Sequence, residues 1–419
     1  MTPSPIWRPF TQHGLDEPVP EVVRTEGAAL YTRDGRRVID AISSWWVTTH
    51  GHRHPRIMRA IAETTESLDQ LIFAGWTHAP AEDLARRLIE IAPSGLEHVF
   101  YSDSGSTSVE VALKMALGVF SNRGEARSRI LVLDHSYHGD TIGAMSVGER
   151  GVFTAAYRDL LFEVERAPLP HAGQEQATLD AVEAFCRRPD ACAFILEPLV
   201  LGAGGMLMYG PKTLRAMREI CARHGVFFIA DEVMTGFGRT GSLFACDQAG
   251  ISPDILCLSK GLTGGAIPLA VTLATPEIFE AHRSTDRSKM FFHSSSYTAN
   301  PIACAAGLAN LDIWRDEPVM ERIATLEQRQ AALLARLAKR DDLANARQTG
   351  TIIALDLAAD SSGYLANAGQ SLRRLFQDAD VLLRPLGSTL YVLPPYCIGE
   401  ADLERVGDVI EQGLDALKA

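Results

Sequence analysis

Short apolar runs recur along the chain, separated by stretches that are mostly long enough to hold a helix. Uninterrupted runs of this kind are typical of parallel strands that are covered on both faces. They occupy residues 99–101, 130–133, 193–196, 226–230, 255–258 and 269–273. Because parallel strands need crossover connections, the pattern predicts an α/β fold with a mainly parallel central sheet.

Apolar residues at helical spacing predict the connections of this sheet. The predicted helices cover residues 57–70, 79–92 and the stretch that ends at residue 120, and a longer helical stretch covers about 302–340. Before them, the strand-like residues 29–32 and 38–40 flank an Asp34-Gly35 turn, which predicts a hairpin. Two further strand-like stretches lie at 352–355 and 390–393.

This distribution predicts how the chain divides into domains. We expect residues 56–320 to form a large domain around the central sheet. Residues 1–55 and 321–419 carry the hairpin and the last strands, so we expect them to form one small α+β lobe from both ends of the chain.

Composition narrows the class of protein and its partners. Hydrophobic residues make up 46% and charged residues 22%, which is typical of a compact folded chain. The formal net charge of -12 argues against a nucleic-acid partner. No apolar run is long enough to span a membrane, and the first residues lack the features of a signal peptide. The seven cysteines form no CxxC pair, so a reducing cytoplasm is the expected compartment.

Chemically distinctive side chains follow four of the predicted strands. Tyr137, Glu197, Asp231 and Lys260 each come at or shortly after a strand's carboxyl end. Ligands of open α/β sheets bind in the crevice outside these ends. One such residue alone would be read as a solvated loop group, but four together predict a shared site.

Two hydroxyl-rich stretches are candidates for binding an anion. Residues 102–108 contain four serines and one glycine where a helix is predicted to begin, and free backbone N–H groups at a helix start can bind phosphate. Serine and threonine also act as ordinary helix caps, so this pattern fits either role. Residues 293–298 are the second candidate.

Two other motifs point to chemistry that their context does not support. Residues 236–241 match GxGxxG, but they lie several residues beyond the strand and no clear helix follows, so we predict a turn and not a dinucleotide site. His50, His52 and His54 alternate as metal ligands on a strand would. Gly51 and Pro55 favour a turn, and no cysteine or carboxylate cluster accompanies them, so we predict no metal site.

Three more residues allow two interpretations each. The adjacent Trp45 and Trp46 could line a pocket, or one could pack in the core while the other covers a lobe interface. Arg384 precedes Pro385 and a turn, where its guanidinium could meet a carboxylate or simply lie on the surface.

Taken together, the candidate groups match the needs of pyridoxal 5'-phosphate. Its aldehyde forms a Schiff base with a lysine, a carboxylate pairs with its ring nitrogen, and its phosphate binds at a helix N-terminus. Lys260, Asp231 and residues 104–107 would fill these places, with Tyr137 stacked on the ring.

Several motifs also resemble class III pyridoxal-phosphate aminotransferases over nearly the whole chain. They are ILEP at residues 195–198, DEVMTGFGRTG from Asp231, and SKGLTGG from Ser259. The resemblance implies the type I aminotransferase fold and a homodimer with active sites at the subunit interface. It also implies that a hydroxyl near Ser296 reaches the phosphate bound by the partner subunit.

Within the class, the chain looks most like the branch that acts in biotin synthesis. The matching segments are WRPFT from Trp7, SSWW from Ser43, DSGS from Asp103, YHGD from Tyr137, GAGGM from Gly202, Arg384-Pro385 and PPY from Pro394. This likeness implies conversion of 8-amino-7-oxononanoate to 7,8-diaminononanoate through two half-reactions, with S-adenosylmethionine as the donor and Lys260 carrying the cofactor.

The same likeness assigns roles residue by residue. The implied catalytic residues are Lys260, Asp231 and Tyr137. The cofactor would also contact Ser104, Gly105, Ser106 and Ser296. The implied substrate-binding residues are Phe10, Trp45, Trp46, Tyr137, Asp140, Arg239, Ser294 and Arg384. Apolar walls with one arginine suit a long aliphatic keto acid.

Two departures from the family pattern leave alternatives open. Phe10 stands where a tyrosine hydroxyl usually contributes to the donor site, so lysine or another amine could replace S-adenosylmethionine. Ser294-Ser295-Ser296 replaces Gly-Pro-Thr, which keeps the hydroxyl at Ser296. An ω-amine:pyruvate aminotransferase, an aminomutase of the same fold and a non-catalytic relative that binds a ligand or a partner chain are the alternative functions.

Overall fold

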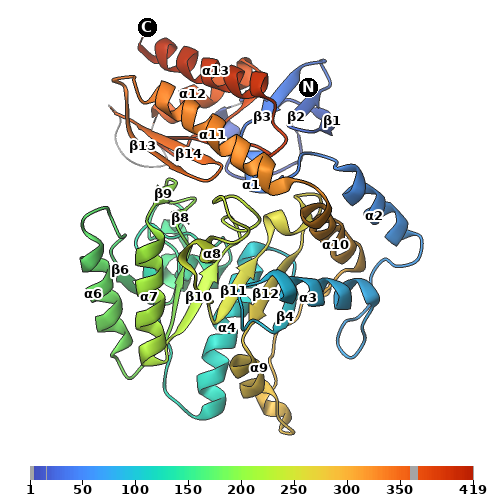
Figure 1. Ribbon diagram of the computed structural model, residues 1–419, viewed down its shortest axis with the longest axis vertical. Coiled ribbons are helices and arrows are strands. Elements are labelled where there is room, and N and C mark those ends of the chain that lie inside the picture. Colours follow the sequence, from blue (N-terminus) through green and yellow to red (C-terminus); the bar gives the residue numbers. More distant parts are fainter. Residues whose placement is uncertain (1–3, 16, 359–366, 419) are drawn as a thin grey trace.

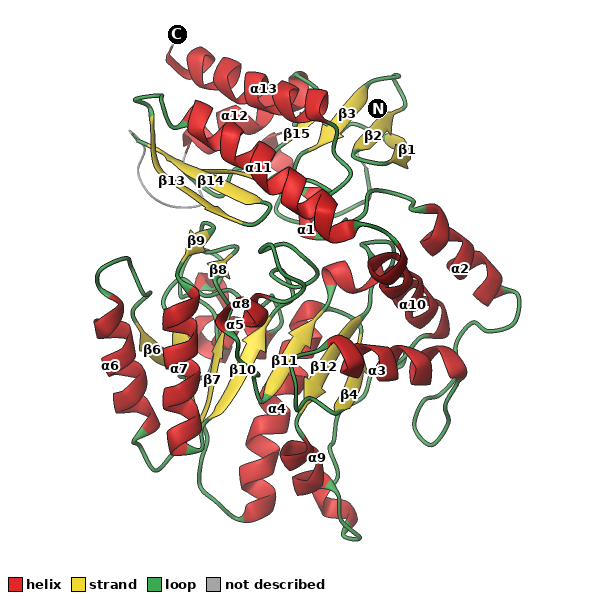
Figure 2. Ribbon diagram, viewed as in Figure 1, coloured by secondary structure: helices red, strands yellow, loops and turns green. Residues whose placement is uncertain are grey.

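The computed structural model describes residues 4–15, 17–358 and 367–418. Figures 1 and 2 show a large sheet flanked by helices, and above it a second group of smaller sheets and helices that contains both ends of the chain. The described part contains no helix that is both long and apolar enough to cross a membrane.

The central sheet has seven strands and is mainly parallel, which confirms the predicted α/β class. Its order is β4 (His98–Ser102), β12 (Ala270–Ala274), β11 (Ile255–Leu258), β10 (Phe227–Asp231), β7 (Ala191–Leu196), β5 (Arg129–Leu133) and β6 (Glu165–Ala167). Strand β12 runs in the direction opposite to the other strands of this sheet. The register pairs Asp231 with Cys257 and Ala230 with Leu196, so the ends of three strands lie level.

Alternate residues of these strands pack against different helices. Ile130 and Ile229 belong to a core cluster with α4 (Gly105–Arg123), whereas Phe194 and Phe228 belong to a cluster on the other face. Both faces are therefore buried, which explains why the strands are apolar at every position. The other helices of this part are α2 (Pro55–Thr65), α3 (Ala79–Ile91), α5 (Ile142–Ser146), α6 (Glu175–Cys186), α7 (Pro211–His224), α8 (Ala245–Ala249), α9 (Pro276–His282) and α10 (Pro301–Asp316).

The helical region predicted near residues 302–340 is helical, with one break that the sequence interpretation did not place. It divides into α10 and α11 (Val319–Leu337), and Glu317-Pro318 separates them. Proline lacks an N–H and disfavours helical geometry in the residue before it, so the helix ends there. The helix predicted at 57–70 also ends early, at Thr65.

The two ends of the chain meet in the smaller sheets. One sheet has the order β1 (Val22–Glu26), β2 (Ala29–Thr32), β3 (Arg37–Asp40) and β15 (Val381–Leu382), and the other has β13 (Leu343–Thr349), β14 (Ile352–Leu357) and β16 (Thr389–Val392). Helices α12 (Asn367–Asp378) and α13 (Glu400–Lys418) pack beside α11. A short hairpin of β8 (Val200–Leu201) and β9 (Leu207–Met208) lies between β13 and the central sheet.

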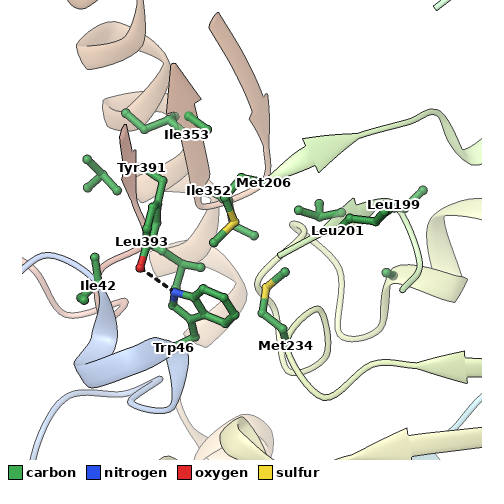
Figure 3. Close-up of a cluster of buried hydrophobic side chains, with 14 of the residues drawn as sticks. Ile42, Trp46, Leu199, Leu201, Met206, Met234, Ile352, Ile353, Tyr391 and Leu393 are labelled. Carbon is green, nitrogen blue, oxygen red and sulfur yellow. Dashed lines mark hydrogen bonds between the residues drawn. The ribbon is translucent and has the colours of Figure 1, made fainter. Parts of the chain in front are cut away.

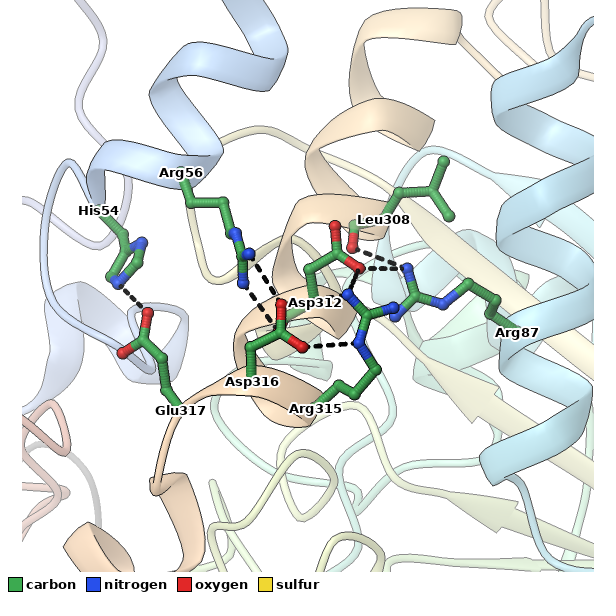
Figure 4. A network of polar contacts seen from close by, with 8 residues as sticks. All are labelled: His54, Arg56, Arg87, Leu308, Asp312, Arg315, Asp316 and Glu317. Atoms are coloured by element: carbon green, nitrogen blue, oxygen red, sulfur yellow. Dashed lines mark hydrogen bonds and ion pairs between the residues drawn. The ribbon is translucent and has the colours of Figure 1, made fainter.

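The alternating histidines have separate partners. His50 lies 2.9 Å from the Asn310 side chain, and His52 lies 2.9 Å from Asp40. His54 faces Glu317 beside the ion pairs that join α2 and α3 to α10 (Figure 4). Among the described residues, no group of three or more His, Cys, Asp or Glu side chains is arranged to hold a metal ion.

Candidate active site

The four predicted strand-end residues come from adjacent strands. Tyr137 follows β5, Glu197 follows β7, Asp231 ends β10, and Lys260 comes two residues after β11. Since these strands are parallel neighbours, all four residues lie at the same edge of the sheet.

Asp231 is almost fully buried, and both of its carboxylate oxygens have partners. Oδ2 lies 2.7 Å from His138 Nδ1, and Oδ1 accepts the Val233 N–H at 3.1 Å. The other nitrogen of the same imidazole, Nε2, is buried without a hydrogen bond to any described residue. Our sequence interpretation missed His138, although it directly follows Tyr137 in the predicted loop.

Glu197 connects two loops of the site. Its Oε1 accepts the Tyr137 N–H at 3.0 Å, and its Oε2 accepts the Gly202 N–H at 2.8 Å. Burial raises the pKa of Glu197 to about 7, although these hydrogen bonds favour its charged form. The residue thus positions Tyr137 and the start of the 202–206 loop.

Lys260 is held in a constrained backbone conformation, with φ of +39°. Its Nζ lies 5.0 Å from the centre of the Trp46 ring and makes no hydrogen bond to the described residues. Burial lowers the pKa of this amine, and the negative charges of Asp231 and Glu197 oppose that effect. A lysine of this kind is suited to act as a nucleophile and a base.

The two tryptophans point in different directions because their backbone is left-handed. All four residues of α1 (Ser43–Trp46) have φ between +46° and +74°, which is rare away from glycine. Trp46 is buried and donates from Nε1 to the Tyr391 hydroxyl at 3.0 Å (Figure 3). Trp45 is 37% exposed. One tryptophan therefore packs inside, against Lys260, and the other faces outward.

Arg384 lies beside the exposed tryptophan and not alone on the surface. Its guanidinium carbon is 5.1 Å from the centre of the Trp45 ring, and Nη2 donates to the Phe10 carbonyl at 3.0 Å. The Phe10 ring contacts Trp45 at 5.4 Å and Phe153 at 5.8 Å between ring centres. The N-terminal segment thus brings an aromatic group to the predicted carboxylate site.

The start of α4 packs closely against the loops that follow β5 and β10. Ser104 and Thr107 form a reciprocal capping box, so Ser104 acts as a helix cap in this structure. A Cβ at Gly105 would lie 2.6 Å from Val233, and one at Gly139 would lie 2.0 Å from the Ser106 hydroxyl. Ser106 Oγ also accepts the Asp140 N–H at 3.1 Å.

Arg239 is buried and bound to backbone carbonyls. Nη1 donates to Pro394 at 3.1 Å, and Nη2 donates to Trp46 at 3.2 Å and Thr48 at 2.9 Å. These contacts come from the turn at 236–241, and they hold the segment that carries the tryptophans. Any effect of Arg239 on a substrate through these contacts would be indirect.

A cavity of about 560 Å³ opens beside Tyr137. Its lining is predominantly apolar and includes the side chains of Met145, Val152, Phe153, Leu207 and Leu386. Tyr137 and Asp140 stand at one side, and Ala203, Gly204 and Gly205 form another. Because Phe153 also touches Phe10, the aromatic group beside Arg384 adjoins this cavity.

The segment Ser294–Ser296, called here the serine loop, is largely exposed and contacts the residues just before α4. Ser295 donates a hydrogen bond to Asp103, and the Ser296 carbonyl accepts one from the Gln70 side chain at 2.7 Å. Ser294 and Ser296 are both exposed. Their predicted contacts with substrate and cofactor remain predictions.

The residues present fit the cofactor expected from the sequence. A lysine amine that makes no hydrogen bond within the described part of the chain, a buried carboxylate and an aromatic ring occupy adjacent strand ends. The start of α4 belongs to the strand–helix turn after β4, in the same sheet. This is the set of groups that a ring carrying an aldehyde and a phosphate requires.

Comparison with known proteins agrees with this geometry. A model of the family "Aminotransferase class-III" matches residues 11–414. The adenosylmethionine-8-amino-7-oxononanoate aminotransferase of Synechococcus elongatus is 47% identical, over 98% of this chain and 99% of the relative. The enzyme of that name from Mycobacterium leprae is 37% identical, over 96% of this chain and 93% of the relative.

Solved structures give the same result. The crystal structure of adenosylmethionine-8-amino-7-oxononanoate aminotransferase from Methanocaldococcus jannaschii superposes with a TM-score of 0.94 at 32% identity, covering 98% of this chain and 97% of that chain. An amine transaminase from an uncultivated Pseudomonas species, in its PLP-bound form, superposes with a TM-score of 0.91 at 31% identity, covering 98% of both chains.

Proposed function

The chain belongs to the class III aminotransferase family, and from this premise we propose that it aminates 8-amino-7-oxononanoate to 7,8-diaminononanoate, the step expected in biotin synthesis. The observation that carries the proposal is the predominantly apolar cavity beside Tyr137, which adjoins the aromatic residues around Arg384. Apolar walls accommodate an aliphatic chain, and a guanidinium binds a terminal carboxylate.

We infer that pyridoxal 5'-phosphate is the cofactor and that this chain's residues hold it by its two ends. Asp231, fixed by His138, would face the ring nitrogen, and the N-terminus of α4 with Ser104, Gly105 and Ser106 would hold the phosphate. When bound, the cofactor supplies an electron sink that stabilises negative charge on the substrate carbon. Tyr137 would lie against the ring, with its backbone N–H fixed by Glu197.

Lys260 has two tasks in the proposed reaction. Its amine would hold the cofactor's aldehyde between turnovers, and it would act as the base and acid that moves a proton at the substrate carbon. The lowered pKa of Lys260 favours the neutral amine that both tasks need. The two half-reactions, with donor and then acceptor, use the same site in turn.

We propose S-adenosylmethionine as the donor, with Trp45, Trp46, Asp140, Arg239 and Ser294 in the substrate-binding set. The support is the name shared by the relatives from Synechococcus elongatus and Mycobacterium leprae, since Phe10 cannot supply the hydroxyl that a tyrosine would.

We also propose a homodimer, in which Ser296 of one subunit reaches the phosphate held by the other. Large apolar side chains are exposed on and near the serine loop, which is typical of a surface that another protein covers. They are Ile72, Trp76, Phe292 and Tyr297.

A donor screen tests the proposal. Purified protein with added pyridoxal phosphate is incubated with 8-amino-7-oxononanoate and separately with S-adenosylmethionine, lysine or alanine, and 7,8-diaminononanoate is measured. We expect product with S-adenosylmethionine. Efficient amination of pyruvate without any 7,8-diaminononanoate would instead identify an ω-amine:pyruvate aminotransferase. A protein that gains no visible absorbance with the cofactor would be a non-catalytic relative.

A further inference from the structure

One wall of the cavity is a loop that contains two adjacent glycines. Residues 203–205 line the cavity, and two of them are glycines. Gly205 has φ of +108°, and a Cβ at Gly204 would lie 2.3 Å from the His135 carbonyl oxygen. A larger residue would be strained at Gly205 and would collide with His135 at Gly204, so neither position carries a side chain that could hold this wall.

Arg347, from strand β13, holds this loop by its carbonyl groups. Its Nε donates to the Met206 carbonyl at 2.8 Å, and its Nη2 donates to the Gly205 carbonyl at 2.7 Å. More than 140 residues separate the arginine from the loop along the chain. The contact therefore joins the C-terminal sheet to the wall of the cavity.

The remaining donors of Arg347 are also used. Nη1 donates to the Asn345 carbonyl at 2.7 Å and to Asp356 Oδ2 at 3.0 Å, while Nη2 donates to Asp356 Oδ1 at 2.9 Å. All five N–H groups of the guanidinium thus have an acceptor. A lysine could not reproduce this arrangement, because its three donors radiate from one atom.

The backbone of β13 explains why the arginine points toward the loop. The pairing of β13 with β14 shifts register between Ala344 and Arg347, and Asn345 has φ of +50°. A bulge of this kind re-aims the side chains that follow it.

Asp356 connects the same arginine to a second, neighbouring segment of the cavity lining. Its Oδ1 accepts the Thr389 hydroxyl at 2.8 Å, and Thr389 lines the cavity together with Ser388 and Leu386. A Cβ at Gly205 would lie 3.4 Å from the Thr389 hydroxyl oxygen, so the two segments adjoin. The Arg347–Asp356 pair is only 15% and 23% exposed, so solvent screens it little. One ion pair therefore holds both segments of this wall.

We propose that Arg347, oriented by Asp356, is a positioning residue that fixes this wall of the cavity and thereby selects long aliphatic keto acids over short ones. The identity of the long acceptor rests on the proposed function. Arg347 itself acts only through the backbone of residues 205–206 and through Thr389.

The kinetic test compares R347Q with R340Q. Arg340 is a matched control, because it pairs with Asp342 at similar exposure. Among the described residues, its side chain donates only to Asp342 and Asp415, which do not line the cavity. For R347Q we expect the KM for 8-amino-7-oxononanoate to rise about tenfold, in keeping with the loss of hydrogen bonds from a charged group. The KM for pyruvate and the rate of the donor half-reaction should change less than about twofold. R340Q should match the wild type in each measurement.

Two further variants separate positioning from general stability. R347K keeps the charge but not the planar set of donors, so its KM for the long acceptor should stay raised. In R347A, added methylguanidinium should lower that KM toward the wild-type value. If R347Q does not fold, D356N is measured in its place, and it should raise the KM in the same direction.

Hydrogen exchange supplies a readout that does not depend on the reaction. Backbone amides of residues 203–207 should exchange about tenfold faster in R347Q than in R340Q or the wild type. Unchanged exchange, or an equal rise in KM for R340Q, would overturn the inference. A wild-type protein that aminates no long keto acid would overturn the proposed function and with it the selectivity, while the exchange comparison would still decide whether Arg347 holds the wall.

Discussion

The imidazole of His138 and the carboxylate of Asp231 are joined by a 2.7 Å contact between Nδ1 and Oδ2, deep at the end of β10. Both side chains are at most 5% exposed. Because the other carboxylate oxygen accepts the Val233 N–H, the group is held at both oxygens. A carboxylate fixed in this way can meet a ring nitrogen without first reorganising.

Replacement of His138 by alanine should weaken retention of the cofactor. A hydrogen bond to a charged group contributes about 1.5–3 kcal/mol, so the dissociation constant should rise at least tenfold. Titration of the cofactor's absorbance measures it. H98A is the control, since His98 stacks on Phe279 at the opposite end of β4. Equal affinity in H138A and wild type would contradict the assigned role.

Lys260 should be indispensable. K260A should retain the fold yet lose transamination by several orders of magnitude, because no other described amine takes its place at the end of β11. A coupled assay for product measures the rate, and K212A on α7 is a control with a surface lysine. Transamination by K260A at the parent rate would rule out the proposed mechanism.

Glu197 should make stability depend on pH. Its pKa is raised from 4.5 to about 7 in the folded state. The folded state therefore binds more protons than the unfolded state between these values, so the stability that Glu197 contributes below pH 4.5 is lost as pH rises to about 7. The free energy of unfolding, measured by thermal unfolding at each pH, should fall more steeply for the wild type than for E197Q across this window. The difference should reach up to ~3 kcal/mol. Parallel curves would contradict the raised pKa.

Arg384 should matter for the acceptor and not for the donor. R384A should raise the KM for 8-amino-7-oxononanoate roughly tenfold to a hundredfold, because a guanidinium–carboxylate contact contributes about 1.5–3 kcal/mol. The donor half-reaction, followed by absorbance, should change little. R374A is the matched control, since Arg374 is 57% exposed and pairs with Glu17. A similar KM in R384A and wild type would show that the acceptor's carboxylate does not bind at Arg384.

Phe10 offers a gain-of-function test. F10Y adds a hydroxyl to a ring that packs on Trp45, so we expect kcat/KM for S-adenosylmethionine to rise about two- to tenfold. The acceptor KM should stay constant. F153Y, which alters the neighbouring ring, is the control. If lysine and not S-adenosylmethionine gains from F10Y, the donor assignment changes.

Local pattern predicted the large elements and the residues at the strand ends. Buried parallel strands are apolar at nearly every position, so the sequence shows where each strand lies and where its carboxyl end comes. Because β10 and β11 are such strands, the sequence placed both Asp231 and Lys260 at strand ends. The break between α10 and α11 was missed, although Pro318 supplied the local signal.

The sequence by itself determined the family, the apolar character of the central strands and the positions of Asp231 and Lys260 at strand ends, because motifs and apolar runs are properties of neighbouring residues. Only the tertiary structure decided which polar groups support them. His138 meets Asp231 across 93 residues, Arg239 reaches Trp46 across 193, and Arg347 reaches Gly205 across 142. Each of these bonds depends on where the fold places two distant backbones, and no local pattern encodes that placement.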